Sequence, residues 1–186
     1  GSVLFHVGVR VIFFGHLFGL LMPADVFHAL GISTMAKQVM AITVGGIAGL
    51  MALAGGVILL HRRLADPRIR ANSTFGDTAI LALLVAQLVI GLGTILVALD
   101  HLDGSKMLLF MAWAQGIFTF QPDAAEHIRD AHWVFKLHIF LGLLIFVCVP
   151  FTRLVHMFSA PVRYLWRPGY QVVGTRRHNL PAEGKG

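Results

Sequence analysis

Four long apolar runs divide the chain, at residues 3–22, 38–60, 78–99 and 133–158. Each run is close to the ~20 residues that an α-helix needs to cross ~30 Å of hydrocarbon. The runs are continuous and lack the alternating pattern of membrane β-strands. Hydrophobic residues make up 56% of the chain and charged residues only 13%, so the chain is less polar than a soluble domain. The sequence therefore predicts an all-α integral membrane helical bundle with four transmembrane helices.

The loops between these runs differ in their content of Lys and Arg. Loop 23–37 has no Lys or Arg before Lys37, and loop 100–132 carries more acidic than basic residues. Most basic residues lie in loop 61–77 or after residue 158: Arg62, Arg63, Arg68, Arg70, Arg163, Arg167, Arg176, Arg177 and Lys185. Cytoplasmic loops are enriched in Lys and Arg. We therefore expect loop 61–77 and both termini to be cytoplasmic, and we attribute the net charge of +6 to this asymmetry rather than to a nucleic-acid partner.

Two further segments complete the organisation. Residues 106–120 form an apolar stretch of 15 residues, which is too short for a fifth span, so we expect an interfacial or re-entrant helix there. We expect residues 1–160 to form the transmembrane domain. Residues 161–186 are polar and rich in Gly, Pro and Arg, and we expect them to form a cytoplasmic tail that meets a partner. The single cysteine, Cys148, excludes an internal disulfide or a Cys-ligated cluster within this chain alone.

Two pairs of histidines lie inside the first and the last apolar runs. His6 and His16 belong to the first run, and His138 and His156 to the last. An ionisable side chain at bilayer depth is costly and usually functional. Eighteen residues separate His138 from His156, about five turns, so both would leave one face of a continuous helix. His6 and His16 are about 80° apart around their helix. Four imidazoles on two helices are enough for the axial ligands of two stacked haems.

The predicted topology determines how the four histidines would pair. The first helix runs outwards and the last runs inwards, so His6 meets His156 near the cytoplasm and His16 meets His138 near the outer face. The separation along the first helix is about 15 Å and along the last about 27 Å. Helix tilt, a bend at Pro150 or tilted haem planes would absorb the difference.

Several residues of these runs have two interpretations. A single membrane histidine can be explained by a helix–helix hydrogen bond, whereas a non-haem metal site would need acidic residues that both runs lack. Arg10 would reach either a haem propionate or a partner helix. Arg153 would bind a propionate through charge-assisted hydrogen bonds or act as an ordinary inner-face anchor. Gly15 and Gly142, each close to one histidine, would make room for a flat macrocycle, although glycines also permit close helix packing.

These motifs resemble one family, the gamma subunit of respiratory nitrate reductase, a membrane cytochrome b. The matching stretches are LFHVGVRVIFFGHLFGLLMP, HRRLADPRIR, DHLDGSKM followed by WAQ, and KLHIFLG followed by PFTRLVHMFSAPVRYL. The resemblance extends from Leu4 to about Tyr170. The family has five spans, so the resemblance implies that the first is absent from this sequence, which we attribute to truncation. Arg10 also departs from the family pattern, which leads us to expect an apolar residue there.

The resemblance implies two low-spin b-type haems, each with two histidine ligands. The ligands carried over are His6 and His156 for the haem nearer the cytoplasm, and His16 and His138 for the haem nearer the outside. The resemblance also implies a quinol site beside the outer haem, near Gly15, His16 and Lys37. A lysine at the membrane edge can donate a hydrogen bond to a quinone oxygen and stabilise anionic character as protons leave. The alternative for Lys37 is an anchor that extends its ammonium to the surface.

The resemblance implies an electron-transfer subunit of a quinol-dependent nitrate reductase in the cytoplasmic (inner) membrane. Quinol would release its protons outside, and its electrons would pass through both haems to an iron–sulfur beta subunit. Nitrate would be reduced in a molybdenum-containing alpha subunit. Two alternatives stay open. One is a quinone-linked cytochrome b subunit of a heterodisulfide or sulfite reductase-type complex. The other is a haem-free, His-rich proton or metal transporter, against which the absence of paired half-helices or inverted repeats argues.

Overall fold

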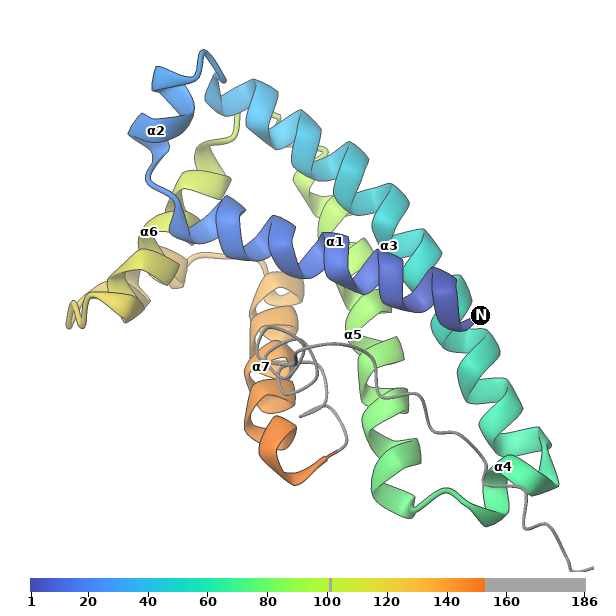
Figure 1. Ribbon diagram of the computed structural model, residues 1–186. Helices are drawn as coiled ribbons and strands as arrows, with labels where there is room; N and C mark the ends of the chain where they lie inside the picture. The colour runs from blue at the N-terminus through green and yellow to red at the C-terminus, as the bar shows by residue number, and fades with distance from the viewer. Residues whose placement is uncertain (101, 153–186) are drawn as a thin grey trace, which may run out of the picture. The chain divides into compact units, whose positions relative to one another are not determined.

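The computed structural model describes residues 1–100 and 102–152, and within these ranges every regular element is a helix (Figure 1). Four stretches are long and apolar enough to cross a membrane. They are α1 (Ser2–Leu21), α3 (Thr34–Ala65), α5 (Phe75–Ala98) and Trp133–Phe151, which joins α7 (Trp133–Cys148) to the short 3-10 helix η2 (Val149–Phe151). The prediction of an all-α chain with four apolar spans is confirmed.

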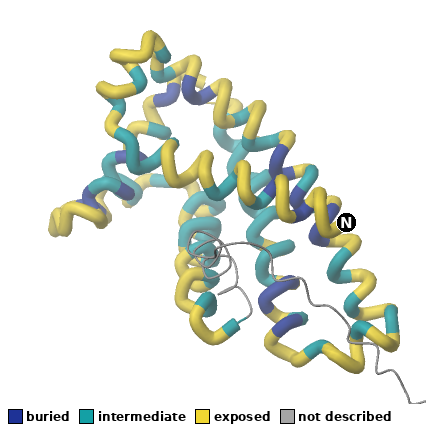
Figure 2. The backbone as a smooth tube through the Cα atoms, viewed as in Figure 1, coloured by how far each residue is buried: buried dark blue, intermediate teal, exposed yellow. Residues whose placement is uncertain are grey.

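The long helices pack in chain order. Helix α1 lies against α3, α3 against α5, and α5 against α7 (Figure 1). The shorter elements are α2 (Ala24–Ala29), α4 (Pro67–Ala71), α6 (Ser105–Phe118) and η1 (Ala124–Ile128). Helix α6 packs on α1 and η1. Buried residues are few, and the other residues of the long helices are intermediate or exposed (Figure 2), as expected of helices whose apolar surface faces lipid.

Small residues hold α1 directly against α3. A Cβ added at Gly55 of α3 would lie 2.4 Å from the backbone nitrogen of Phe5 in α1, and one added at Gly8 would lie 2.6 Å from the carbonyl oxygen of Ala48. Ala52, at the same crossing, is fully buried, with 0% of its surface exposed. Membrane helices associate through small residues because lipid supplies no hydrophobic drive between them. The position of α1 is therefore set by contacts between the two backbones.

Two helices begin earlier than the predicted runs because polar residues cap them. The Ser33 side chain accepts a hydrogen bond from the backbone N–H of Ala36 at 3.1 Å, which starts α3 at Thr34 rather than near residue 38. Thr74 and Asp77 form a capping box that starts α5 at Phe75 rather than at residue 78. Such caps satisfy the free N–H groups of a first helical turn. Helix α3 also continues past residue 60 to Ala65, so it is longer than its apolar run.

The last apolar run is not one regular helix. Helix α7 ends at Cys148, η2 contains Pro150, and Thr152 has an extended backbone. Proline lacks the N–H that a helix interior requires, which explains why the α-helical geometry stops here. The expected five-turn register between His138 and His156 assumed one continuous helix, whereas the α-helix that carries His138 ends at Cys148. Residues 153–158 of the predicted span, and the predicted tail 161–186, lie outside the described residues.

The apolar stretch at 106–120 forms a short helix, as predicted. Helix α6 has 14 residues and is not one of the candidate spans. It begins after Gly104, whose φ of +79° is a left-handed conformation that glycine adopts without strain. The interfacial or re-entrant placement of α6 stays a prediction.

Candidate functional site

The rings of His16 and His138 face each other, although their helices are distant in the sequence. His16 lies near the C-terminal end of α1 and His138 in the second turn of α7. Their ring centroids are 6.1 Å apart, and their planes are inclined at 42°. The long helices that pack closely against each other are α1 with α3, α3 with α5 and α5 with α7, so this histidine pair joins two long helices that do not pack along their length.

Two of the predicted ligands have the tautomer that leaves Nε2 free to bind a metal. The Nδ1 of His16 is 2.9 Å from the carbonyl oxygen of Ile12, and the Nδ1 of His6 is 2.8 Å from the carbonyl oxygen of Ser2. A carbonyl oxygen only accepts, so in each neutral imidazole Nδ1 carries the proton. The lone pair then lies on Nε2, the nitrogen that points away from the helix backbone. Ligating histidines commonly donate their other ring N–H in this way.

The outer pair is close enough to share one metal ion. The ring centroids are 6.1 Å apart, and each imidazole would hold such an ion through a metal–nitrogen bond of about 2 Å. Residues 1–100 and 102–152 contain no group of three or more His, Cys, Asp or Glu side chains that could hold a metal by themselves. Two imidazoles would be a sufficient set of protein ligands for a haem, because the macrocycle would supply the remaining nitrogens.

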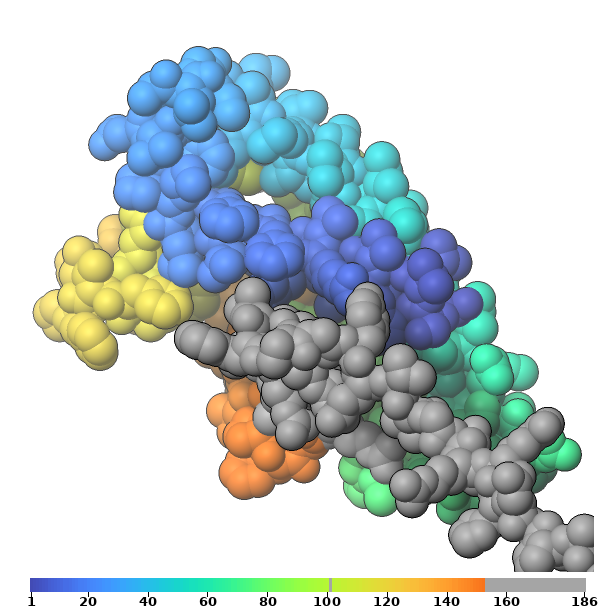
Figure 3. Space-filling view, in the orientation of Figure 1, coloured from blue at the N-terminus to red at the C-terminus, as the bar shows by residue number. Residues whose placement is uncertain are grey.

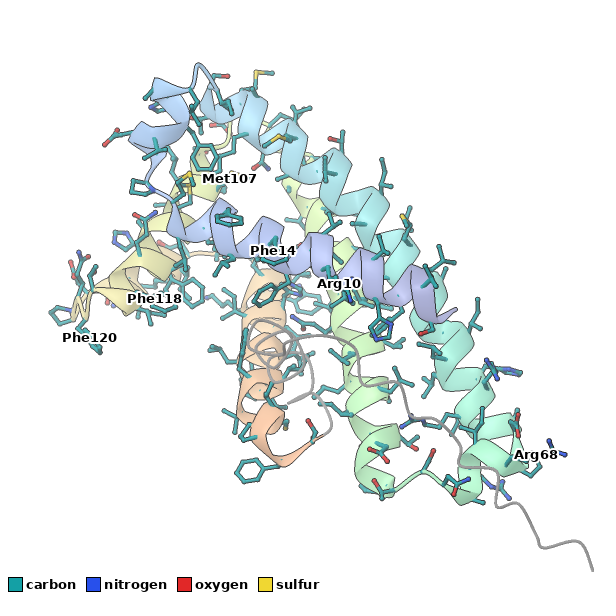
Figure 4. All side chains as sticks on the ribbon, viewed as in Figure 1. Arg10, Phe14, Arg68, Met107, Phe118 and Phe120 are labelled. Atoms are coloured by element: carbon teal, nitrogen blue, oxygen red, sulfur yellow. The ribbon has the colours of Figure 1, made fainter. Side chains whose placement is uncertain are left out.

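Of the predicted inner pair, His6 and His156, only His6 lies within the described residues. His6 lies at the start of the second turn of α1, is exposed, and its ring contacts Phe5 edge-on, with 5.6 Å between centroids. His156 and Arg153 lie outside the described residues, so their pairing and propionate roles stay predictions. Arg10 projects from the middle of α1 with an exposed side chain (Figure 4). Both interpretations of Arg10 therefore stay open.

Lys37 is buried, with 5% of its surface exposed. Its Nζ donates hydrogen bonds to the carbonyl oxygen of Gly19 at 2.8 Å and to the Sδ of Met111 at 2.9 Å. The same Nζ lies 3.8 Å from the centre of the Phe27 ring, a cation–π contact. The lysine therefore does not extend to the surface as an anchor would. Lys37, which belongs to α3, thus contacts α1, α2 and α6. Its partner in α1, Gly19, lies three residues beyond His16.

Gln115 of α6 also binds backbone carbonyls at the C-terminal end of α1. Its Nε2 donates to the carbonyl oxygens of Leu20 at 3.0 Å and of Met22 at 3.4 Å. The last carbonyls of a helix lack partners within the helix and attract positive charge. Lys37 and Gln115 therefore cap the C-terminal end of α1 from two other helices. The atoms of α6 and of the end of α1 meet at this place in the space-filling view (Figure 3).

The two glycines near the outer histidines differ in their surroundings. A Cβ added at Gly15 would have no neighbour within 4 Å, so the backbone beside His16 is open. A Cβ added at Gly142 would lie 3.2 Å from the Nε2 of Gln87. Gly142 therefore admits a side chain of α5, rather than leaving open space for a macrocycle.

Sequence reasoning missed two residues of α5 that contact His138. A Cβ added at Gly91 would lie 2.9 Å from the Cε1 of His138. The Nε2 of Gln87 donates to the carbonyl oxygen of His138 at 2.9 Å. The available signal was Gln87 itself, a polar side chain in the middle of an apolar run, where polar groups are expensive and usually have a specific partner.

Comparisons with known proteins identify related chains. The family model of the nitrate reductase gamma subunit matches residues 1–176. The chain is 47% identical over 176 residues to the respiratory nitrate reductase 2 gamma chain of Escherichia coli (strain K12), covering 95% of this chain and 77% of that one. It is 45% identical over 175 residues to the respiratory nitrate reductase 1 gamma chain of the same organism, covering 94% and 77%. It is 40% identical over 167 residues to the nitrate reductase gamma chain of Bacillus subtilis (strain 168), covering 90% and 74%.

Proposed function

We propose that this chain, which belongs to the nitrate reductase gamma subunit family, oxidises membrane quinol near the outer face and delivers the electrons to the cytoplasmic side. As a member of that family it is the cytochrome b subunit of a respiratory nitrate reductase. The facing rings of His16 and His138, 6.1 Å apart, are the observation that carries the proposal.

Two haems b are the proposed cofactors. His16 and His138 would hold the outer haem, and His6 and His156 the inner one, with Arg153 at an inner propionate. The hydrogen bonds from Nδ1 of His6 and His16 to their own helix support this assignment, because they keep each Nε2 free to bind metal. When bound, the haems supply one-electron carriers between the quinol and an iron–sulfur protein.

The proposed quinol site lies between Gly15, His16 and Lys37. The Lys37 ammonium has three N–H donors, of which two bind Gly19 and Met111. The third could meet a quinol oxygen, and the positive charge would lower the pKa of that hydroxyl. The open backbone at Gly15 provides space beside His16. Lys37 would thus orient the substrate and favour the departure of its protons.

The proposed orientation rests on the distribution of basic residues. The segment that joins α3 to α5 carries Arg62, Arg63, Arg68 and Arg70, and we place it in the cytoplasm. Residues 1–160 would form the transmembrane domain, and the tail 161–186 would be cytoplasmic. An iron–sulfur beta subunit would dock on this face, with the molybdenum-containing alpha subunit beyond it. Quinol would be oxidised at the opposite face, so charge would be separated across the membrane.

A haem assay and a quinol assay test the proposal together. The pyridine haemochrome of the detergent-solubilised chain should give two haems b per chain. A quinol analogue should reduce both of them. A preparation that contains no haem would contradict the cytochrome assignment and favour the haem-free transporter. Co-purification of a molybdenum subunit would separate nitrate reductase from a heterodisulfide or sulfite reductase-type complex.

A further inference from the structure

Helices α5 and α7 interlock at one place, where each presents a polar side chain to a glycine of the other. Gln87 of α5 lies against Gly142 of α7, with 3.2 Å between its Nε2 and a Cβ added at the glycine. His138 of α7 lies against Gly91 of α5, with 2.9 Å between its Cε1 and an added Cβ. In both helices the glycine follows the polar residue by one turn. The contact is therefore reciprocal and admits little rotation of α7 relative to α5.

Gln87 also binds the backbone of the residue that it faces. Its Nε2 donates to the carbonyl oxygen of His138 at 2.9 Å. Within a helix this oxygen already accepts the N–H of the residue four positions on, Gly142. The amide therefore adds a second donor to one carbonyl of α7, at the position of the predicted ligand. The missing side chain of Gly142 is what lets the amide approach that carbonyl.

Two buried polar atoms at this contact have no partner. Among the described residues, the Oε1 of Gln87 and the Nδ1 of His138 are the buried side-chain atoms that lack a hydrogen bond. His6 and His16 differ, because their Nδ1 atoms donate to carbonyls of their own helix. A buried polar atom without a hydrogen-bond partner destabilises the folded chain. The two atoms without a partner thus belong to Gln87 and His138, the two residues that the 2.9 Å hydrogen bond joins.

We infer that Gln87 is a positioning residue for His138. Its amide nitrogen holds the His138 carbonyl, and its amide oxygen is the acceptor for the His138 Nδ1–H when Nε2 binds the outer haem. The inference rests on the proposed function, because it takes His138 as a haem ligand. An acceptor on the second ring nitrogen fixes the tautomer and raises the basicity of a ligating imidazole. A more basic ligand favours the oxidised iron, so Gln87 should keep the potential of the outer haem low.

The main test is Gln87→Leu in the membrane-bound complex with the full chain. Leucine keeps the size of the side chain but removes both polar atoms. We expect the outer haem to bind about 10- to 100-fold more weakly, the range found when an outer-shell partner of a ligand is lost. The midpoint potential of the retained outer haem should rise, and its low-spin electron paramagnetic resonance signal should shift. The inner haem should keep its potential and its signal.

Glycine variants separate this role from general packing. Gly91→Ala would push against the His138 ring and should displace the outer haem signal more strongly than Gln87→Leu. Gly93→Ala is the matched control, because an added Cβ there meets only Val134 at 3.8 Å, an ordinary contact. Gly142→Ala moves the Gln87 amide without deleting it and should raise the outer potential by less than Gln87→Leu. If Gln87→Leu does not fold, Gly142→Ala still tests whether the position of the Gln87 amide affects the potential of the outer haem.

The possible results are distinct. An outer haem with unchanged potential and signal in both Gln87→Leu and Gly142→Ala would overturn the inference, because packing alone would then position His138. Equal shifts of both haems would also overturn it, since they would report a general distortion. If His138→Ala retains both haems, the proposed function fails at the ligand assignment, whatever Gln87 does.

Discussion

The crossing of α1 and α3 and the contact of α5 with α7 are built from different chemistry. At the first, Gly55 and Gly8 bring two backbones together, and the buried groups, Phe5, Ala48 and Ala52 among them, are apolar. At the second, glycines make room for polar side chains, and Gln87 and His138 each keep one buried atom without a partner. The first contact is complete within the chain. On the proposed function, the second contact would be completed when the outer histidine pair binds its cofactor, so architecture and function would be carried by separate interfaces.

Breaking the complete interface should have the largest effect. Gly55→Leu would force a side chain into a space where even a Cβ lies 2.4 Å from the Phe5 nitrogen. We expect a loss of at least about 1–3 kcal/mol from overpacking, a lower unfolding temperature and loss of both haems. Gly45→Leu on the same helix is the control, because a Cβ added there has no neighbour within 4 Å. Similar unfolding temperatures and haem contents for the two variants would show that the crossing does not set the architecture.

Removing one ligand should have a large but local effect. His138→Ala should abolish the outer haem and leave most of the inner haem, because the α1–α3 crossing does not depend on His138. His156→Ala should chiefly disturb the inner haem. Redox titration of the haem absorption in membranes resolves the two components. Selective loss in the reverse order would show that the predicted antiparallel pairing of these histidines is wrong.

Removing the buried cation should slow quinol oxidation without removing haem. In Lys37→Ala the substrate loses a charged donor, so we expect haem reduction by a quinol analogue to slow on the order of 100-fold. Reduction by dithionite should remain complete. Gln115→Leu is the matched control, because Gln115 caps the same end of α1 without a charge. If both variants slow quinol oxidation equally, Lys37 acts only as a helix cap.

Filling the open space beside His16 should have the smallest effect. Gly15→Ala adds a methyl group where no protein atom lies within 4 Å, so folding and haem content should be unchanged. If quinol occupies this space, its KM should rise a few-fold while kcat stays similar. An unchanged KM would move the quinol site away from Gly15. A lower haem content would mean instead that the methyl group disturbs His16.

The sequence predicts the number of helices better than their ends. Long apolar runs require helices in lipid, so four spans could be inferred without the structure. The starts of α3 and α5 were missed because Ser33 and Thr74 cap turns that are too polar to belong to an apolar run. Pro150 did signal the irregular end of the last span. The order of packing was not predictable, because the small residues of one helix do not reveal which helix they meet.

The candidate site was only partly predictable for a related reason. The facing of His16 and His138 follows from antiparallel helices and the depth of each histidine. The burial of Lys37 could not be predicted from the sequence. A lysine near a helix end has the same sequence pattern whether its side chain reaches solvent or binds backbone carbonyls. Gln87 was missed because an isolated amide in an apolar run has no evident partner until α5 and α7 are placed together.

The cap on α1 has a consequence for how such chains diverge. Lys37 and Gln115 hold backbone oxygens of residues 19, 20 and 22, not their side chains. Substitutions at those three positions leave the hydrogen bonds available, provided that the helix end keeps its path. Selection on the cap should therefore fall on residues 37 and 115, while positions 19, 20 and 22 change independently of them. A search for co-varying residue pairs would overlook the contacts of this cap with α1, although it could detect the side-chain contact of Lys37 with Met111.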